Sequence, residues 1–115
     1  MKQIFAAAIT AAAILFAASC RSDKIVPSSL ECSGVVRYST DIRPFVLTHC
    51  AITGCHVTGF AQGDYTLYQP LKVRADNGRL RFFVLELRAM PPNDSVTEEQ
   101  RQMIGCWIEQ GALHN

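Results

Sequence analysis

Two cysteines and a histidine lie close together near the middle of the chain, at Cys50, Cys55 and His56. Two thiols and an imidazole at this spacing can do three kinds of chemistry. They can close a small disulfide loop, bind zinc with His49 as a fourth ligand, or attach a haem group through thioether bonds. The residues around this cluster, and the elements that carry it, favour the third.

The spacing of the two cysteines is a longer form of the c-type haem motif. In the usual motif two residues separate the cysteines and the histidine follows directly, so that the thioethers hold the porphyrin while the imidazole binds iron. Here four residues separate Cys50 from Cys55. The extra pair must bulge outward to keep the two sulfurs at the spacing of the vinyl groups, and Gly54 supplies the backbone freedom for that bulge.

A helix is expected to deliver this cluster to the core. The pattern predicts a helix over Asp41–His49, capped by Ser39 or Thr40, with Asp41 at its positive end. Three apolar residues, a histidine and the first thiol fall at i, i+3, i+4, i+7 and i+8, which places them on one face: Ile42, Phe45, Val46, His49 and Cys50.

The remainder of the chain also favours short helices. A capping box of Thr97 and Gln100 opens a helix that runs to about Gln110 and ends at Gly111. Its apolar face consists of Met103, Ile104, Trp107 and Ile108. Before it we expect a short helix at about Thr66–Val73, a turn at Asn77-Gly78, a buried strand or helix over Leu80–Leu87, and an extended loop over residues 90–93.

From Tyr38 onward the chain resembles the small cytochrome c domains of secreted bacterial proteins, of the planctomycete type. The resemblance rests on YSTDIRPF at 38–45, CAITGCH at 50–56, MPP at 90–92 and WIEQGA at 107–112. It implies one covalently bound haem c, with thioethers at Cys50 and Cys55, His56 as the proximal iron ligand and Met90 as the distal ligand.

Other residues remain alternatives for these roles. For Met90 the alternative to a ligand is a side chain that fills a gap in the core, which is what most methionines do. Its position in a stiff, proline-bounded loop favours the ligand. His49 and His114 are weaker candidates for the distal ligand, and Met103 is expected in the core of its helix. Trp107 is expected to be a core aromatic near the haem. Arg79 and Arg81 either pair with the haem propionates or form a solvated face.

The first residues predict export and lipid attachment. Residues 1–19 carry Lys2, a short apolar stretch and then small residues that lead to Cys20, which is typical of a cleaved lipoprotein signal. The run is too short to be a typical membrane-spanning helix, which needs about 20 apolar residues. Ordinary signal cleavage, leaving a stray thiol, is the alternative. We expect a lipid on Cys20, a tether and lead-in over residues 20–37, and one domain over residues 38–115.

The cysteine count predicts a disulfide, and the net charge argues against one class of function. Of the five cysteines, the lipid takes Cys20 and the haem takes two, which leaves Cys32 and Cys106. We predict a disulfide between them, against the alternative that Cys106 is a buried thiol. The formal net charge is only +1, which argues against binding nucleic acid. A small disulfide loop of Cys50 and Cys55 stays open, whereas zinc is less favoured because thiolates are hard to keep reduced outside the cytoplasm.

These observations predict an all-α, cytochrome c-like domain of three or four short helices around one covalently bound haem. The expected function is one-electron transfer to an unidentified redox partner protein, in the cell envelope, with the membrane contacted through the N-terminal lipid. We expect no enzymatic activity and no small-molecule substrate, because no general acid, base or nucleophile is arranged for catalysis. The alternative is a disulfide-stabilised exported lipoprotein module that binds a protein or envelope partner without haem.

Overall fold

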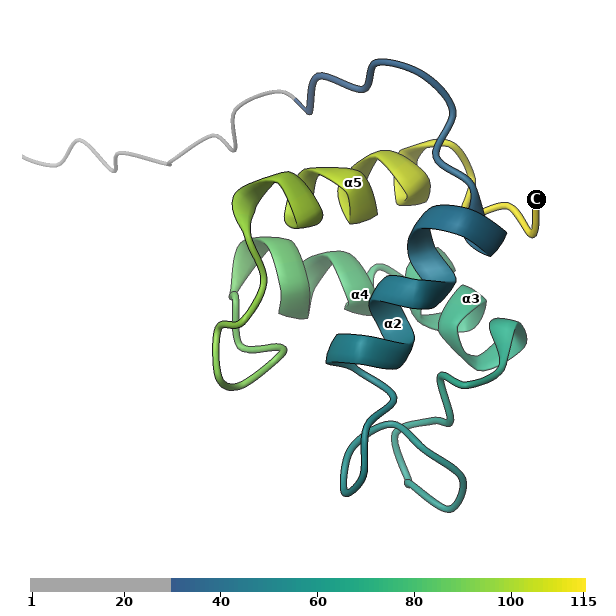
Figure 1. Cartoon of the computed structure of the whole chain (residues 1–115), viewed down its shortest axis with the longest axis vertical. Helices are drawn as coiled ribbons and strands as arrows, with labels where there is room; N and C mark the ends of the chain where they lie inside the picture. Colours follow the sequence, from purple (N-terminus) through teal and green to yellow (C-terminus); the bar gives the residue numbers. More distant parts are fainter. Residues whose placement is uncertain (1–29) are drawn as a thin grey trace, which may run out of the picture.

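The computed structural model describes residues 30–115, and within this range the chain forms four helical segments and no strand (Figure 1). Two of the segments combine a π-helical and an α-helical part. Their bounds are η1 Tyr38–Ile42 with α2 Arg43–His49, α3 Tyr68–Asp76, α4 Arg79–Arg81 with η2 Phe82–Glu86, and α5 Glu98–Glu109. The predicted helical class is confirmed, and the ambiguous stretch Leu80–Leu87 is helical as far as Glu86.

The predicted signal segment 1–19, Cys20 and the first part of the tether lie outside the described residues. Within residues 30–115, no helix is both long enough and apolar enough to cross a membrane.

The helix that leads to Cys50 begins earlier than predicted, so the expected caps at Ser39 and Thr40 are wrong. Helical geometry starts at Tyr38, and the backbone N–H of Arg37 donates to Oδ2 of Asp41 over 2.7 Å. Because the Asp41 side chain reaches back to this amide, the helix starts before both predicted capping residues. The apolar face is as expected: Ile42, Phe45 and Val46 are buried.

The turn between α3 and α4 depends on a glycine. The predicted helix at Thr66–Val73 is observed as α3, shifted toward the C-terminus. Gly78 then adopts a left-handed conformation with φ of 78°, and Oδ1 of Asn77 accepts a hydrogen bond from the backbone of Arg79. An L side chain rarely adopts this conformation, so the glycine lets the chain turn directly into α4.

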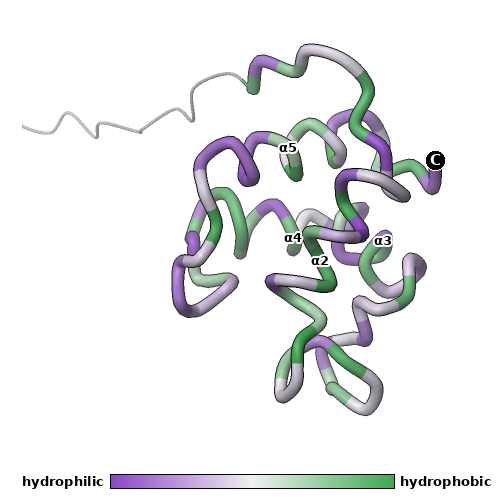
Figure 2. Tube along the Cα trace, viewed as in Figure 1, coloured by the Kyte–Doolittle hydropathy of each residue, from purple (hydrophilic) through white to green (hydrophobic). Residues whose placement is uncertain are grey.

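The C-terminal helix α5 agrees closely with the prediction. The hydroxyl of Thr97 accepts from the Gln100 amide, and the Gln100 side chain accepts from the Thr97 amide. The helix packs against η1 and η2. Trp107 is fully buried at 0% exposure, and its Nε1 donates to the carbonyl of Leu113 over 3.0 Å. Each labelled helix carries both hydrophobic and hydrophilic positions, as expected for helices with one buried face (Figure 2).

The lead-in segment before Tyr38 is fastened to α5. A disulfide joins Cys32 to Cys106, with the sulfurs 2.08 Å apart, so Cys106 is not a free buried thiol. The Gln110 side chain adds two hydrogen bonds of 2.9 Å, accepting from the Val36 amide and donating to the Gly34 carbonyl. Residues 32–36 therefore belong to the folded domain and are not part of a free tether.

Candidate functional site

A cavity of about 450 Å³ opens where the loop after α2 meets α4, η2 and the loop after η2. This volume falls in the range of small-molecule and cofactor sites. All four haem-binding candidates line it: Cys50, Cys55, His56 and Met90. Most of the other lining residues are apolar or aromatic, among them Phe60, Tyr65, Leu80, Phe83 and Val84. The fold thus brings the segment Cys50–His56 and the loop of Met90, which are far apart in the sequence, to one cavity.

The two cysteines of the cluster are free thiols, so the alternative of a small disulfide loop is not observed. Burial, and to a lesser extent the neighbouring Cys55, raises the pKa of Cys50 to about 12. The four residues between them form a compact turn, in which the His56 amide donates to the Cys50 carbonyl over 3.1 Å. Gly54 has a positive φ of 82° and Ile52 is 41% exposed. The segment therefore bulges outward as predicted.

The imidazole of His56 is held by a backbone carbonyl and two aromatic rings. Its Nδ1 lies 3.2 Å from the carbonyl oxygen of Gly63. Because a carbonyl only accepts, Nδ1 carries the proton in this contact and Nε2 keeps its lone pair. The ring stacks on Tyr65 and meets the edge of Phe60. Burial lowers the pKa of His56, although the Gly63 hydrogen bond opposes that shift. Nε2 is therefore the ring nitrogen of His56 whose lone pair is left unused by this contact.

Met90 lies in the loop between η2 and α5. Its side chain lines the cavity and is 41% exposed, while its backbone amide donates to the Phe83 carbonyl over 3.2 Å. The following residue, Pro91, is buried and also lines the cavity. The loop was predicted to be extended, and instead its residues turn back, with the Asp94 amide donating to the Pro91 carbonyl over 3.1 Å.

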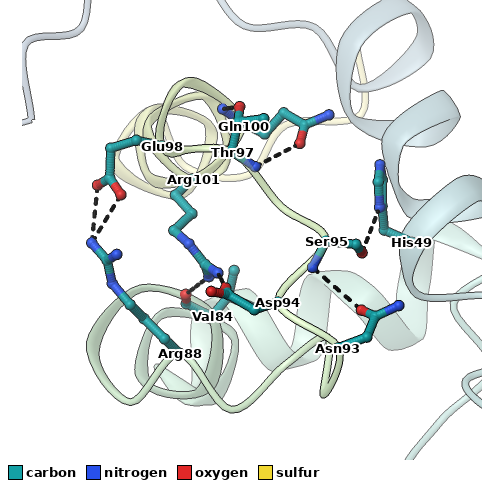
Figure 3. Close-up of polar contacts among 10 residues, drawn as sticks. All are labelled: His49, Val84, Arg88, Asn93, Asp94, Ser95, Thr97, Glu98, Gln100 and Arg101. Atoms are coloured by element: carbon teal, nitrogen blue, oxygen red, sulfur yellow. Dashed lines mark hydrogen bonds and ion pairs between the residues drawn. The ribbon is translucent and has the colours of Figure 1, made fainter.

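The alternative ligands are placed differently. His49 lines the cavity, but its Nδ1 is 3.2 Å from the Ser95 hydroxyl (Figure 3). Its ring stacks on Phe45. His114 stacks on Tyr68 and is not among the residues that line the cavity, so the structure does not bring it together with the other candidates. Within residues 30–115, no three His, Cys, Asp or Glu side chains are grouped so as to hold a metal ion.

Two arginines border the cavity, and only one of them was singled out by the sequence. Arg79 lines it, with its guanidinium 5.9 Å from the centre of the Phe83 ring. Arg81 instead pairs with Glu109 over 3.0 Å and does not line the cavity. Arg74 was missed: it lines the cavity and donates to the Gln62 carbonyl over 2.9 Å. No signal in the sequence singled out Arg74, because a run of positive charges is usually a solvated face.

No family model matches the chain, and comparisons with curated proteins and with solved structures found no match either. The inferences below therefore rest on the residues and the geometry of the cavity.

Proposed function

We propose that this chain is a cytochrome c-like electron carrier that binds one haem c covalently in the cavity. The observation that carries the proposal is that Cys50, Cys55, His56 and Met90 line one largely apolar cavity while both thiols are free. The residue types fit the group, because two thiols, one imidazole and one thioether are the set that attaches haem c and ligates its iron.

Each residue has a distinct role in this proposal. Cys50 and Cys55 would hold the haem through thioether bonds, and His56 and Met90 would ligate its iron. The bound haem supplies a one-electron iron couple. The Gly63 carbonyl orients the His56 ring, and the lowered pKa of His56 keeps Nε2 available as a neutral ligand. Phe60, Phe83 and Val84 restrict water, and a drier site favours reduced iron.

The remaining parts of the proposal concern location and partners. A lipid on Cys20 would hold the domain at a membrane of the cell envelope, where it exchanges electrons with a redox partner protein. Arg79 and Arg74, at the cavity, are the cationic side chains available to the haem propionates. Electron transfer needs no bound substrate, so the domain would act as a carrier and not as an enzyme.

The test is whether the chromophore survives denaturation. The chain is produced in a host with a haem-attachment system, separated by denaturing electrophoresis and measured in the Soret region. We expect the wild type to retain its absorbance and a Cys50→Ser, Cys55→Ser double variant to lose it. A Cys32→Ser, Cys106→Ser double variant is the matched control and should keep it, because that pair lies outside the cavity. A colourless wild type would overturn the proposal and favour the haem-free partner-binding module.

A further inference from the structure

Arg101 is the one charged side chain that is buried among residues 30–115, with 3% exposure. Burying a guanidinium is costly unless its donors are paired, so the partners of this residue indicate what it holds in place. Its Nη1 donates to the carbonyl of Val84 over 2.6 Å, and its Nη2 pairs with the carboxylate of Asp94 (Figure 3). Arg101 on α5 thus links η2 to the Met90 loop.

The Met90 loop, defined here as residues 89–94, is attached at both ends to the same turn of η2. At its start, the carbonyl of Phe83 accepts from the amides of Ala89 and Met90 over 3.0 and 3.2 Å. At its end, Asp94 reaches the neighbouring carbonyl of Val84 through the Arg101 guanidinium. The last carbonyls of a helix lack partners within the helix, so η2 has acceptors free for both attachments.

Asp94 ends the loop in a left-handed backbone conformation, which is uncommon outside glycine. Its φ is +48°, in the left-handed region that non-glycine residues adopt uncommonly, with asparagine and aspartate the most frequent among them. Its side chain is 76% exposed, so burial in the core does not hold it. The contact with the buried guanidinium is a tertiary interaction that ties Asp94 to η2, and the adjoining Ser95 also contacts His49 over 3.2 Å.

From these contacts we infer that Arg101, acting through Asp94 and Val84, is the positioning residue that keeps Met90 at the cavity as the distal ligand. This inference rests on the proposed function for the role of Met90, but the attachment of the loop can be tested without haem. Val84, Met90, Pro91 and Pro92 all line the cavity, so release of Asp94 would loosen one wall of the site.

The first experiment measures amide hydrogen exchange in the full chain as purified. Asp94→Asn is the informative variant, because asparagine tolerates a positive φ while the neutral amide weakens the contact with Arg101. We expect the Ala89 and Met90 amides to exchange about tenfold faster, with the amides of α5 little changed. Glu98→Gln is the matched control, since it neutralises the exposed ion pair with Arg88, at 2.9 Å, on the same side of the domain (Figure 3). Equal protection in both variants would overturn the inference.

A second variant separates positioning from general stability. Arg101→Lys keeps the charge, but a single ammonium lacks the planar fork that reaches both Val84 and Asp94. It should also speed exchange at Ala89 and Met90. If Arg101→Lys does not fold, the Asp94→Asn comparison still decides the attachment of the loop.

The second experiment titrates the oxidised holoprotein with imidazole, which competes with a thioether at the distal position. Asp94→Asn should bind imidazole about tenfold more tightly than the wild type, and Glu98→Gln should bind as the wild type does. Faster exchange with unchanged imidazole binding would overturn the role in ligation. If the chain carries no haem, the proposed function fails, whereas the exchange experiment still supports or overturns the attachment by Arg101.

Discussion

The ring of His56 lies face to face on the ring of Tyr65, with the centroids 3.9 Å apart and the planes 7° from parallel. The same two residues are joined through the backbone, because the Tyr65 amide donates to the His56 carbonyl over 2.9 Å. These two contacts close the loop of residues 57–64 at its base, next to the cavity. The orientation of the imidazole therefore depends on a residue that precedes α3 and not only on the cysteine cluster.

A double-mutant cycle measures this contact. Tyr65→Leu and His56→Ala should each lower the free energy of unfolding, and their combination should lower it by less than the sum. We expect a coupling of about 1 kcal/mol, the usual size for an aromatic pair. Urea denaturation of the four proteins provides the values, and Tyr65→Phe, which keeps the stacked ring, is the control. Strict additivity would show that the two rings do not stabilise each other.

Breaking the disulfide should destabilise the domain as a whole. Cys32 and Cys106 are 74 residues apart, and cross-linking so long a loop restricts the unfolded chain. Cys32→Ser should lower the free energy of unfolding by about 2–4 kcal/mol, below the full chain-entropy value because native strain commonly reduces it. Denaturation with and without reductant tests this, since reductant should destabilise the wild type and leave the variant unchanged. Non-reducing mass spectrometry that finds both thiols free to alkylate would contradict the bond.

Substitution of Met90 should alter the reduction potential of the holoprotein. A thioether favours reduced iron relative to an imidazole, so Met90→His should keep a low-spin haem and lower the potential. Met90→Ala should leave a position that takes up added imidazole or cyanide more readily. Redox titration and absorption spectra distinguish the variants, with Met103→Leu as the control because Met103 is on α5. A potential that is unchanged in Met90→His would show that Met90 only packs in its loop.

Acidification should weaken the loop that carries Asp64. Hydrogen bonds from the hydroxyls of Thr66 and Thr58 lower the pKa of this carboxyl from its ordinary value of 3.8. A lowered pKa in the folded state means that the ionised form adds stability above the ordinary value, and this stability is lost as pH falls through the lowered pKa. Wild type should therefore be more stable than Asp64→Asn at neutral pH, with the difference shrinking below about pH 4. Denaturation of both proteins across this range is the measurement, and a constant difference would assign the effect to something other than the charge.

Membrane attachment is predicted from the sequence at Cys20. Because a single acyl chain anchors only weakly, the multiply acylated cysteine of a lipoprotein is the expected anchor. Cys20→Ala should move the protein from the membrane fraction to the soluble fraction. Fractionation followed by immunoblotting measures this, with Cys32→Ser as the control for loss of a different cysteine. Equal partitioning of wild type and Cys20→Ala would rule out the lipid.

Local signals in the sequence predicted the elements that depend on neighbours within a few residues. The capping box of Thr97 and Gln100 opens α5 as expected, and the outward bulge at Gly54 follows from the spacing of Cys50 and Cys55. The cap of the first helix was predicted wrongly, because several neighbouring residues could each have capped it. Ser39, Thr40 and Asp41 are all good capping residues, and only the folded chain shows which one reaches a free amide.

The tertiary structure decided everything that depends on partners from distant segments. Periodicity could not separate strand from helix over Leu80–Leu87, because a short apolar run suits both, and packing against α5 settled it. Arg74 and Arg101 resemble any solvated arginine in sequence, yet one lines the cavity and the other is buried beneath the Met90 loop. By itself, the sequence determined which residues are candidates for holding a prosthetic group, since this depends on side-chain chemistry and local spacing. Their convergence on one cavity, and the support that holds Met90 there, are long-range packing that no local pattern encodes.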